Sequence, residues 1–302
     1  MTVGAEAIHT PALLDEVMVA LNPRPGGVYV DGTLGLAGHS EAILRRSSPD
    51  GQLIAFDWDE EALRLARERL ALFGKRVTVL RRNFAEIAEA LAGLAVARVD
   101  GILVDVGISS LQLDRGGRGF SFQRDEPLDM RMDSRCGRSA AGLLAAASEA
   151  ELADIFFYYG EERQARRIAR AIVEARTKSP LGTSRELAEL VAWAIPKRFH
   201  PPKIHVATKV FQALRIAVNG ELENLARFLA DAPALLNPGG RLAVISFHSL
   251  EDRLVKRAFR VGSHGLIEKT KHPICAGDDE IARNPRARSA RLRVAEKKES
   301  ER

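Results

Sequence analysis

The first third of the chain alternates between short apolar runs and segments whose apolar positions recur at helical spacing. The apolar runs predict strands at 28–31, 52–56, 77–80 and 100–104, and the periodic segments predict helices at 15–21, 39–46, 60–72 and 86–94. Strands that alternate with helices are typical of βαβ units and therefore of a parallel sheet. Because crossovers are right-handed, the loops that follow the strands lie along one edge, where open α/β sheets bind ligands.

This alternation stops after Asp105. The next strand pattern is 241–247, and the gap before it is far longer than the roughly 30 residues of a βαβ unit. Capping-box patterns at 148–151 and 183–186, with a further periodic segment at 161–176, indicate that the gap is helical.

We therefore expect a helical insertion that divides an α/β core. The expected parts are 1–111 for the first part of the core, 112–205 for the insertion, and 206–302 for the second part of the core. Within the last part, the pattern predicts one long helical segment at 206–236. It also predicts an edge or hairpin strand at 291–295.

A glycine-rich loop follows the first expected strand. Gly32, Gly35 and Gly38 lie in this loop, and Asp57 ends the second strand. Glycines allow the backbone to approach a ligand closely, and an acidic residue about 20 residues further on accepts hydrogen bonds from ribose hydroxyls. A tight structural turn would explain the glycines alone, but the complete βαβ context favours a nucleotide-like cofactor.

The turn at 237–240, Asn-Pro-Gly-Gly, separates two classes of cofactor. NAD enzymes and methyltransferases share the glycine loop and the acidic residue. A Pro-Gly-Gly turn before the fifth strand is typical of class I methyltransferases, in which it reverses the chain after a helix. The combination favours S-adenosylmethionine over NAD.

The charge of the chain is unevenly distributed. The formal net charge of the 302 residues is +5, and residues 253–302 alone carry +7, so the first 252 residues carry −2. A basic segment of this kind suggests a polyanionic partner.

Composition also excludes several classes of protein. Cys136 and Cys275 are not in a paired spacing, which argues against a disulfide framework and a zinc site. The first ten residues lack the basic and apolar regions of a signal peptide, and no apolar run approaches the roughly 20 residues of a membrane helix. We expect a cytoplasmic protein with no metal and no membrane association.

Seven segments, in this order, resemble the bacterial 16S rRNA (cytosine-N4)-methyltransferase family, also called RsmH or MraW. They are DGTLGLAGH at 31–39, DVGISS at 105–110, GFSF at 119–122, PLDMRMD at 127–133, FQALRI at 211–216, SFHSLED at 246–252 and NPRAR at 284–288. The resemblance extends from about residue 9 to residue 296. It implies a class I, Rossmann-like core with an inserted helical domain, and methylation of the N4 amine of one cytosine in the decoding region of 16S rRNA on the small ribosomal subunit.

The resemblance also implies a set of cofactor contacts. They fall on Ala37, Gly38, His39, Asp57, Phe84, Asp105 and Gln112. Asp57 suits ribose, Phe84 offers an apolar face to adenine, and Asp105 can accept from the adenine or the methionine amine. The family usually has glycine where this chain has Ala37, and an alanine is expected to exclude a positive φ.

Cytosine N4 is a poor nucleophile because its lone pair is delocalised into the ring. The enzyme must therefore position the amine and accept hydrogen bonds from it. Methylation of C5 would require a cysteine nucleophile, and neither Cys136 nor Cys275 has an obvious activating partner. The Asn/Asp-Pro-Pro-aromatic motif of many amino-methyltransferases is absent after the fourth strand. The acceptor candidates left open are Asp105, Ser109, Asp129 and His248.

Two groups of arginines are expected to contact the rRNA of the small subunit. They are Arg163, Arg166, Arg167, Arg170 and Arg176 in the insertion, which we expect to recognise the substrate, and Arg286, Arg288, Arg291 and Arg293 in the tail. With only 17 aromatic residues in the chain, a flipped or single-stranded target is favoured over extensive stacking. The oligomeric state, a homodimer included, stays open.

Three other functions compete with this interpretation. A Rossmann oxidoreductase would bind NADH, a small-molecule methyltransferase would not need the basic tail, and a non-enzymatic ribosome assembly factor would bind RNA without using the glycine loop or Asp57. Transfer of a methyl group from S-adenosylmethionine to RNA would distinguish all three from the interpretation above.

Overall fold

A computed structural model describes residues 11–114, 116–135, 137–260 and 265–299. The chain divides into two compact units. The first comprises residues 1–107 and 222–302, and the second comprises residues 108–221. The two units are described separately.

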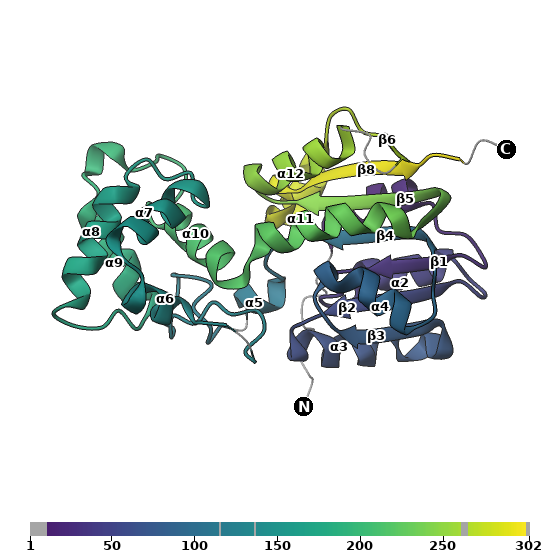
Figure 1. Ribbon diagram of the computed structural model, residues 1–302, viewed down its shortest axis with the longest axis horizontal. Helices are drawn as coiled ribbons and strands as arrows, with labels where there is room; N and C mark the ends of the chain where they lie inside the picture. Colours follow the sequence, from purple (N-terminus) through teal and green to yellow (C-terminus); the bar gives the residue numbers. More distant parts are fainter. Residues whose placement is uncertain (1–10, 115, 136, 261–264, 300–302) are drawn as a thin grey trace. The chain divides into compact units, whose positions relative to one another are not determined.

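The first unit is built on an eight-stranded sheet with the order β3-β2-β1-β4-β5-β8-β6, and β7 pairs with β8. The strands are β1 (Val28–Asp31), β2 (Gln52–Asp57), β3 (Val77–Arg81), β4 (Val99–Asp105), β5 (Leu236–Ser246), β6 (Leu266–Glu268), β7 (Ile274–Cys275) and β8 (Arg291–Lys297). Strands β1 to β5 are parallel to their neighbours, and β8 runs antiparallel to β5 (Figure 1). Strands β1 and β5 share one sheet although 108–221 separates them in sequence, so the predicted fold class is confirmed.

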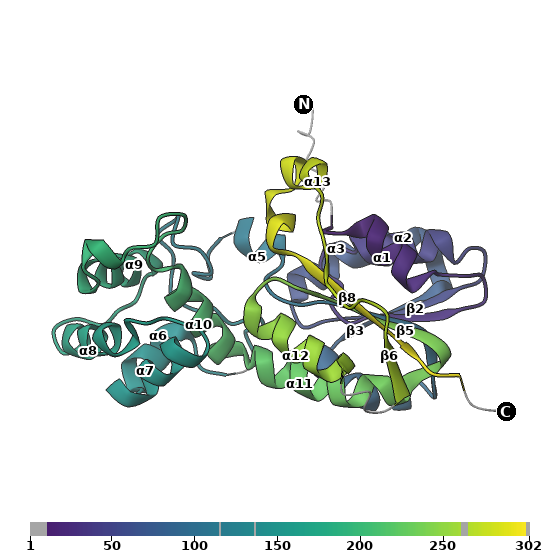
Figure 2. The ribbon, with the colours of Figure 1, turned by 90° about the horizontal axis from the view of Figure 1, so that it is seen from above.

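Helices cover both faces of this sheet (Figure 2). One face carries α1 (Leu14–Leu21), α2 (Gly38–Arg46) and α3 (Glu60–Leu70), and the other carries α4 (Ile87–Gly93), α11 (Glu221–Asp231) and α12 (Ser249–Arg260). Successive strand residues point to opposite faces, so Leu53 and Ala55 of β2 join the first core and Ile54 and Phe56 join the second. This double burial explains why the strands are continuous apolar runs.

Shorter elements complete the first unit. They are the 3-10 turns η1 (Ala71–Arg76), η2 (Phe84–Glu86), η4 (Ala232–Leu235) and η6 (Pro285–Ser289), and the helix α13 (Asp278–Arg283). No helix among the described residues is long and apolar enough to cross a membrane.

The second unit is helical. It contains α5 (Ser110–Asp114), α6 (Ala140–Ala146), α7 (Glu149–Tyr158), α8 (Ala165–Arg176), α9 (Ser184–Ala194), η3 (Lys197–Phe199) and α10 (Thr208–Asn219). Both predicted capping boxes are present: Ser148 with Glu151 begins α7, and Thr183 with Glu186 begins α9. The unit extends beyond the range 112–205 because α10 packs against α6 and α7.

Two expectations for the C-terminal half were right only in part. The segment 206–236 is helical, but it is divided, because Gly220 adopts a left-handed conformation (φ 59°) that ends α10 before α11 begins. For the strand at 291–295 the edge position was wrong, since β5 pairs with one side of β8 and the short strands β6 and β7 pair with the other. The hairpin alternative agrees with the structure, in which β8 runs antiparallel to β7, the strand that precedes it in the chain. The sequence pattern did not reveal β6 or β7.

Candidate functional site

Three aspartates lie at the carboxyl ends of adjacent parallel strands. Asp31 ends β1, Asp57 ends β2 and Asp105 ends β4, and β1 lies between β2 and β4. The chain order of the strands reverses between β1 and β4, since β2 and β3 extend the sheet on one side and β4 and β5 on the other. Such a switch point is where open α/β sheets bind their ligands.

The glycine loop after β1 approaches the sheet closely. A Cβ added to Gly32 would lie 2.8 Å from Cγ2 of Val104 and 2.9 Å from Cβ of Phe84, so only glycine fits at this position. Gly35 has a φ of +49°, which glycine adopts without strain. The loop is therefore shaped by its glycines at both positions.

The backbone conformation of Ala37 differs from the one expected from the sequence. The alanine was expected to exclude a positive φ, yet Ala37 has φ 62° and ψ 24° immediately before α2. This conformation costs roughly 1–2 kcal/mol for a residue with a Cβ. The side chain of Ala37 is fully buried in the core, and its N–H donates to the carbonyl of Leu34 at 2.7 Å. Packing and this hydrogen bond hold the strained geometry.

Gly38 and His39 contact the segment that precedes α1. A Cβ on Gly38 would lie 2.8 Å from Cγ of Pro11, and Nε2 of the buried His39 ring lies 3.0 Å from the carbonyl oxygen of Ala12. These contacts fix the start of α2 against the N-terminal segment.

Asp57 has acceptor capacity left for a ligand. Its Oδ2 accepts from the N–H of Gly35 at 2.8 Å, and its Oδ1 accepts from the N–H of Asp59 at 2.9 Å. A carboxylate has about four acceptor positions, so with these two donors from the described residues Asp57 can accept from two further hydroxyl groups. Burial raises the pKa of Asp57 to about 6, although these two hydrogen bonds oppose the shift.

Phe84 lies beside the glycine loop at the end of β3. Asn83 accepts from the N–H of Ala85 at 2.9 Å and so begins the turn η2, which positions the ring. The ring is half-buried and meets Phe228 edge-on, with centroids 5.5 Å apart. Its apolar surface suits a planar ring such as adenine.

Asp31 was not among the candidates from the sequence. Its side chain is buried, with Ser40 Oγ donating to Oδ2 at 2.7 Å and the N–H of Thr33 donating to Oδ1 at 3.1 Å. Burial raises the pKa of Asp31 to about 6. Thr33 Oγ1 also accepts from the N–H of Asp105 at 2.6 Å, so the loop is tied to the ends of β1 and β4. The position of Asp31 directly before the loop was the available signal.

Asp105 carries a buried oxygen without a donor. Among the described residues, none gives its Oδ1 a hydrogen bond. Burial, with the negative charges of Asp31 and Glu251, raises the pKa of Asp105 well above its usual value. A buried carboxylate oxygen is costly unless it is paired, so the geometry favours a ligand that donates to it.

His248, by contrast, is occupied by its own helix. It precedes α12, its carbonyl accepts from the N–H of Asp252, and its Nδ1 lies 3.4 Å from the N–H of Glu251. Because Nδ1 accepts there, the hydrogen of the neutral ring is on Nε2, which lies 3.1 Å from Oε1 of the buried Glu251 and makes no hydrogen bond among the described residues. Oε2 of Glu251 accepts from the N–H groups of Phe247 and His248 at 2.8 and 3.3 Å. Glu251, which the sequence did not single out, therefore fixes this turn, and His248 behaves as a helix cap.

The remaining predicted site residues belong to the helical unit and are engaged there. Ser109 Oγ accepts from the N–H of Gln112 at 3.3 Å, and Gln112 Oε1 accepts from the N–H of Ser109 at 3.1 Å, which begins α5. Asp129 accepts from Nε and a terminal nitrogen of Arg131 at 2.7 and 2.9 Å. These hydrogen bonds from Arg131 hold the pKa of Asp129 below its usual value.

Comparison with known proteins identifies the family. Residues 6–298 match the profile of the MraW methylase family. The chain belongs to this family. It is 59% identical to ribosomal RNA small subunit methyltransferase H of Desulfotalea psychrophila, over 97% of this chain and 99% of that protein. It is 49% identical to the protein of the same name from Syntrophus aciditrophicus, over 98% of this chain and 100% of that protein.

The fold of this MraW methylase chain also matches a solved structure. A crystal structure from Clostridium thermocellum, described as a candidate rRNA-methylase, aligns with a TM-score of 0.50 at 11% identity. The alignment covers 96% of this chain and 100% of that chain. At this identity the likeness concerns the fold alone.

Several arginines expected to contact RNA have structural partners in this member of the family. The Arg293 side chain is only 4% exposed and pairs with Asp252 at 2.6 Å, and Arg176 donates to the carbonyls of Leu144 and Ala147, both at 2.6 Å. Arg291 lies 3.4 Å from Asp252, and Arg170 lies 3.6 Å from Glu149. These contacts argue against an RNA role for Arg293 and Arg176 in particular.

The other predicted arginines are exposed. They are Arg163, Arg166 and Arg167 in the helical unit, and Arg286 and Arg288 at η6. Cys275 is an exposed free thiol, and Cys136 lies outside the described residues.

Proposed function

We propose that this protein transfers a methyl group from S-adenosylmethionine to the N4 amine of one cytosine in the decoding region of 16S rRNA. Its substrate would be the small ribosomal subunit in the cytoplasm. The observation that carries the proposal is the buried, unpaired oxygen of Asp105 at the switch point of a MraW methylase fold. The two relatives described above are named as methyltransferases of small-subunit rRNA.

The chemistry of the first unit fits S-adenosylmethionine. The glycine loop leaves no room for side chains at Gly32, Asp57 has two acceptor positions for ribose hydroxyls, and Phe84 offers an apolar ring. The carboxylates of Asp31 and Asp105 suit a cationic cofactor. When bound, S-adenosylmethionine supplies an electrophilic methyl group, and the residues of the chain hold the acceptor amine in line with it.

Among the four acceptor candidates, we assign to Asp105 the role of accepting hydrogen bonds from the cytosine amine. His248, Ser109 and Asp129 each have hydrogen-bonding partners within their own turns. Oδ1 of Asp105 can accept a hydrogen bond from the cytosine amine and then take up the proton that N4 loses as its bond to the methyl group forms. The ionised form is required for this step, and a nearby cationic cofactor would favour ionisation.

Replacing Asp57 by Ala should weaken binding of S-adenosylmethionine by about 1.5–3 kcal/mol at pH 8, the range for hydrogen bonds to a charged group. Because the pKa of Asp57 is about 6, wild-type affinity should fall as the pH decreases through 6, and the gap between wild type and variant should narrow. Isothermal titration calorimetry between pH 5 and pH 8 measures both effects. Unchanged affinity at pH 8 in a folded Asp57→Ala protein would remove Asp57 from the site.

Replacing Arg286 and Arg288 together by Ala should weaken binding to small subunits. The salt dependence should also flatten, with the slope of log K against log salt concentration falling by about 0.7–0.9 for each phosphate that the variant no longer neutralises. The matched control is Arg64→Ala with Arg67→Ala, two exposed arginines of α3 whose removal changes the net charge equally. Equal losses of affinity in both double variants would mean that net charge, not binding at η6, determines the affinity.

The direct test of the proposed function is transfer of a labelled methyl group from S-adenosylmethionine to small subunits that lack the modification. We expect incorporation into 16S rRNA by the wild-type protein. Absence of transfer by a protein that binds the cofactor would refute the proposed substrate.

A further inference from the structure

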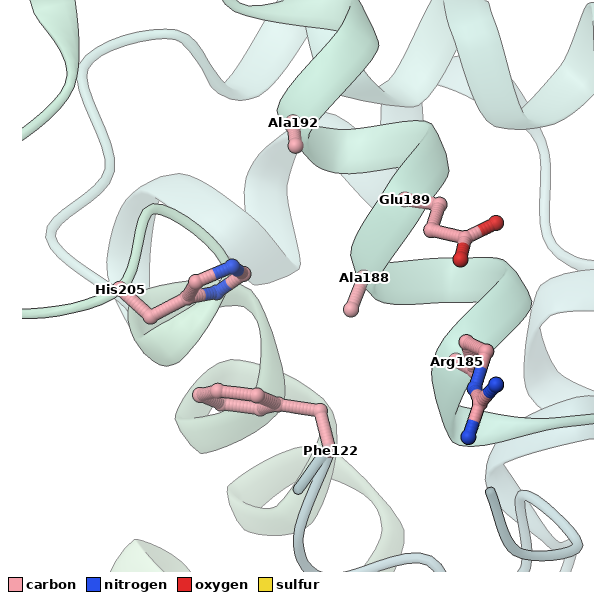
Figure 3. A pocket seen from close by; sticks show the side chains of 6 residues that line it. All are labelled: Phe122, Arg185, Ala188, Glu189, Ala192 and His205. Carbon is pink, nitrogen blue, oxygen red and sulfur yellow. The ribbon is translucent and has the colours of Figure 1, made fainter. Parts of the chain in front are cut away.

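A small cavity lies within the helical unit and plays no part in the site described above. It is lined by Phe122, Arg185, Ala188, Glu189, Ala192 and His205 (Figure 3). Its volume of about 340 Å³ is near the lower end of the range of about 300–1,000 Å³ for small-molecule sites. We call it the α9 pocket, since four of its six residues belong to α9.

The α9 pocket has an aromatic wall with a fixed orientation. The rings of Phe122 and His205 lie 4.7 Å apart at an angle of 32° (Figure 3). Phe122 also meets Phe211 edge-on, with ring centroids 5.0 Å apart. Phe122 belongs to the segment 119–122, to which the proposed methyl transfer assigns no role. Aromatic surfaces of this kind bind unpaired nucleobases by stacking.

Polar groups beside this wall match the edge of a base and its phosphate. Nδ1 of His205 accepts from the N–H of Ala207 at 3.2 Å, so in the neutral ring the hydrogen is on Nε2, which can donate. The exposed carboxylate of Glu189 can accept from an exocyclic amino group. Arg185, whose side chain is 60% exposed, can pair with a phosphate and lies 3.9 Å from Asp125.

The chain segment that supplies five of the six residues of the α9 pocket is basic and carries exposed aromatic side chains. Residues 183–209 contain five Lys or Arg and two Glu, a net charge of +3. Trp193 on α9 is 77% exposed, and the guanidinium of Arg198 lies 4.8 Å from the ring centroid of the exposed Phe199. Cationic and aromatic groups interleaved in this way are typical of surfaces that bind single-stranded nucleic acid.

We propose that the α9 pocket binds one unpaired nucleotide of the RNA substrate, other than the cytosine that is methylated. The base lies against Phe122 and Ala192, its amino group donates to Glu189, and Arg185 pairs with its phosphate. The proposal rests on the proposed function only in that the substrate is RNA. The amino-bearing bases, cytosine, adenine and guanine, are favoured over uracil, which has no exocyclic amine to donate to the Glu189 carboxylate.

The first experiment fills the α9 pocket and measures RNA binding without cofactor. The variant Ala192→Leu adds bulk to the pocket wall, and Ala150→Leu, at an exposed position of α7, is the matched control. The probe is a fluorescently labelled single-stranded oligocytidine. Since stacking contributes about 1–3 kcal/mol per base, Ala192→Leu should raise the Kd about 5- to 150-fold, whereas Ala150→Leu should leave it unchanged.

A second variant tests base recognition without filling the cavity. Glu189→Gln keeps the size of the side chain and adds a donor, so the preference for oligocytidine over oligouridine should shrink. Failure of the proposed methyl transfer would not affect either binding result, so the two proposals can fail separately. Wild-type affinity in Ala192→Leu, or an unchanged base preference in Glu189→Gln, would overturn the assignment of the α9 pocket to RNA, and a protein partner would then become the alternative.

Discussion

Replacing Asp105 by Asn is expected to lower kcat for methyl transfer about 10²- to 10⁴-fold, the range for loss of a positioned proton acceptor. The Kd for S-adenosylmethionine should also rise, because the variant removes a negative charge beside the cationic cofactor, so kcat is compared at saturating cofactor. The physical reason is that an amide cannot take up the proton that N4 loses. Single-turnover transfer to small subunits, with the cofactor bound to saturation, isolates this step.

The acidity of Asp105 adds a readout that a structural role would not give. Because the pKa is raised, the protonated form persists to higher pH, and kcat should rise with pH until Asp105 ionises. This acidic limb should be absent in Asp105→Asn.

The Asp105→Asn variant should lose activity without losing stability at alkaline pH. A carboxyl whose folded-state pKa is raised stabilises the fold fully only below its unfolded pKa, and this contribution is lost as the pH increases. Asp105→Asn should therefore not lower the melting temperature at pH 8.

His248→Asn is the matched control for this assignment. Asparagine is an efficient helix cap, so this variant should keep α12 intact and retain kcat within about tenfold of wild type. If His248 were the proton acceptor, the ranking would reverse, with His248→Asn inactive and Asp105→Asn active.

Replacing Arg293 by Ala is expected to destabilise the protein by about 3–5 kcal/mol, the cost of removing one partner of a buried ion pair. Nε of Arg293 lies 2.6 Å from Oδ1 of Asp252, and β8 lies inside the sheet. In the variant, the Asp252 carboxylate stays buried without Arg293. Its negative charge is then offset by Arg291, a terminal nitrogen of which lies 3.4 Å from Oδ2 of Asp252. Urea unfolding followed by circular dichroism measures the loss.

The loss of stability in Arg293→Ala should depend on pH, because the ion pair requires an ionised Asp252. Burial alone would raise the pKa of Asp252, but the hydrogen bond and charge of Arg293 outweigh it and hold the pKa below its usual value. Such a pair stabilises the fold above the unfolded pKa and loses this effect as the pH falls. The difference between wild type and Arg293→Ala should therefore shrink in acid.

A second variant separates folding from RNA binding at this position. Replacing the pair together, with Arg293→Met and Asp252→Leu, should recover much of the stability, since apolar side chains of similar volume can replace a buried ion pair. A folded Arg293→Ala protein with normal stability and weak RNA binding would contradict the structural role.

The repeating part of the fold could be predicted from sequence because its signals are local. The strands β1 to β4 are buried on both faces, so each is a continuous apolar run, and the capping boxes of α7 and α9 are visible within four residues. The glycine loop and Asp57 could be proposed as candidates for the same reason. The break at Gly220 was also visible as an Asn-Gly pair but was outweighed by the helical periodicity on both sides.

What the sequence could not reveal depends on distant partners. Arg293 and its partner Asp252 are separated by 41 positions, so a buried arginine was indistinguishable from a basic tail. His248 and Asp105 were equal candidates until the structure showed their local contacts. Both have a buried polar atom without a hydrogen-bond partner among the described residues, but Nδ1 of His248 caps α12, so its Nε2 carries the hydrogen of the neutral ring and only the Asp105 oxygen is an acceptor. The left-handed geometry of Ala37 depends on packing, which overrides the usual preference of alanine.

The proposed reaction is most directly tested by the identity of the methylated nucleoside. Small subunits that lack the modification are incubated with the protein and labelled S-adenosylmethionine, and the 16S rRNA is digested to nucleosides and analysed by mass spectrometry. We predict label in N4-methylcytidine, from a single position in the decoding region. Label in 5-methylcytidine or in any other nucleoside, with none in N4-methylcytidine, would contradict the proposed reaction.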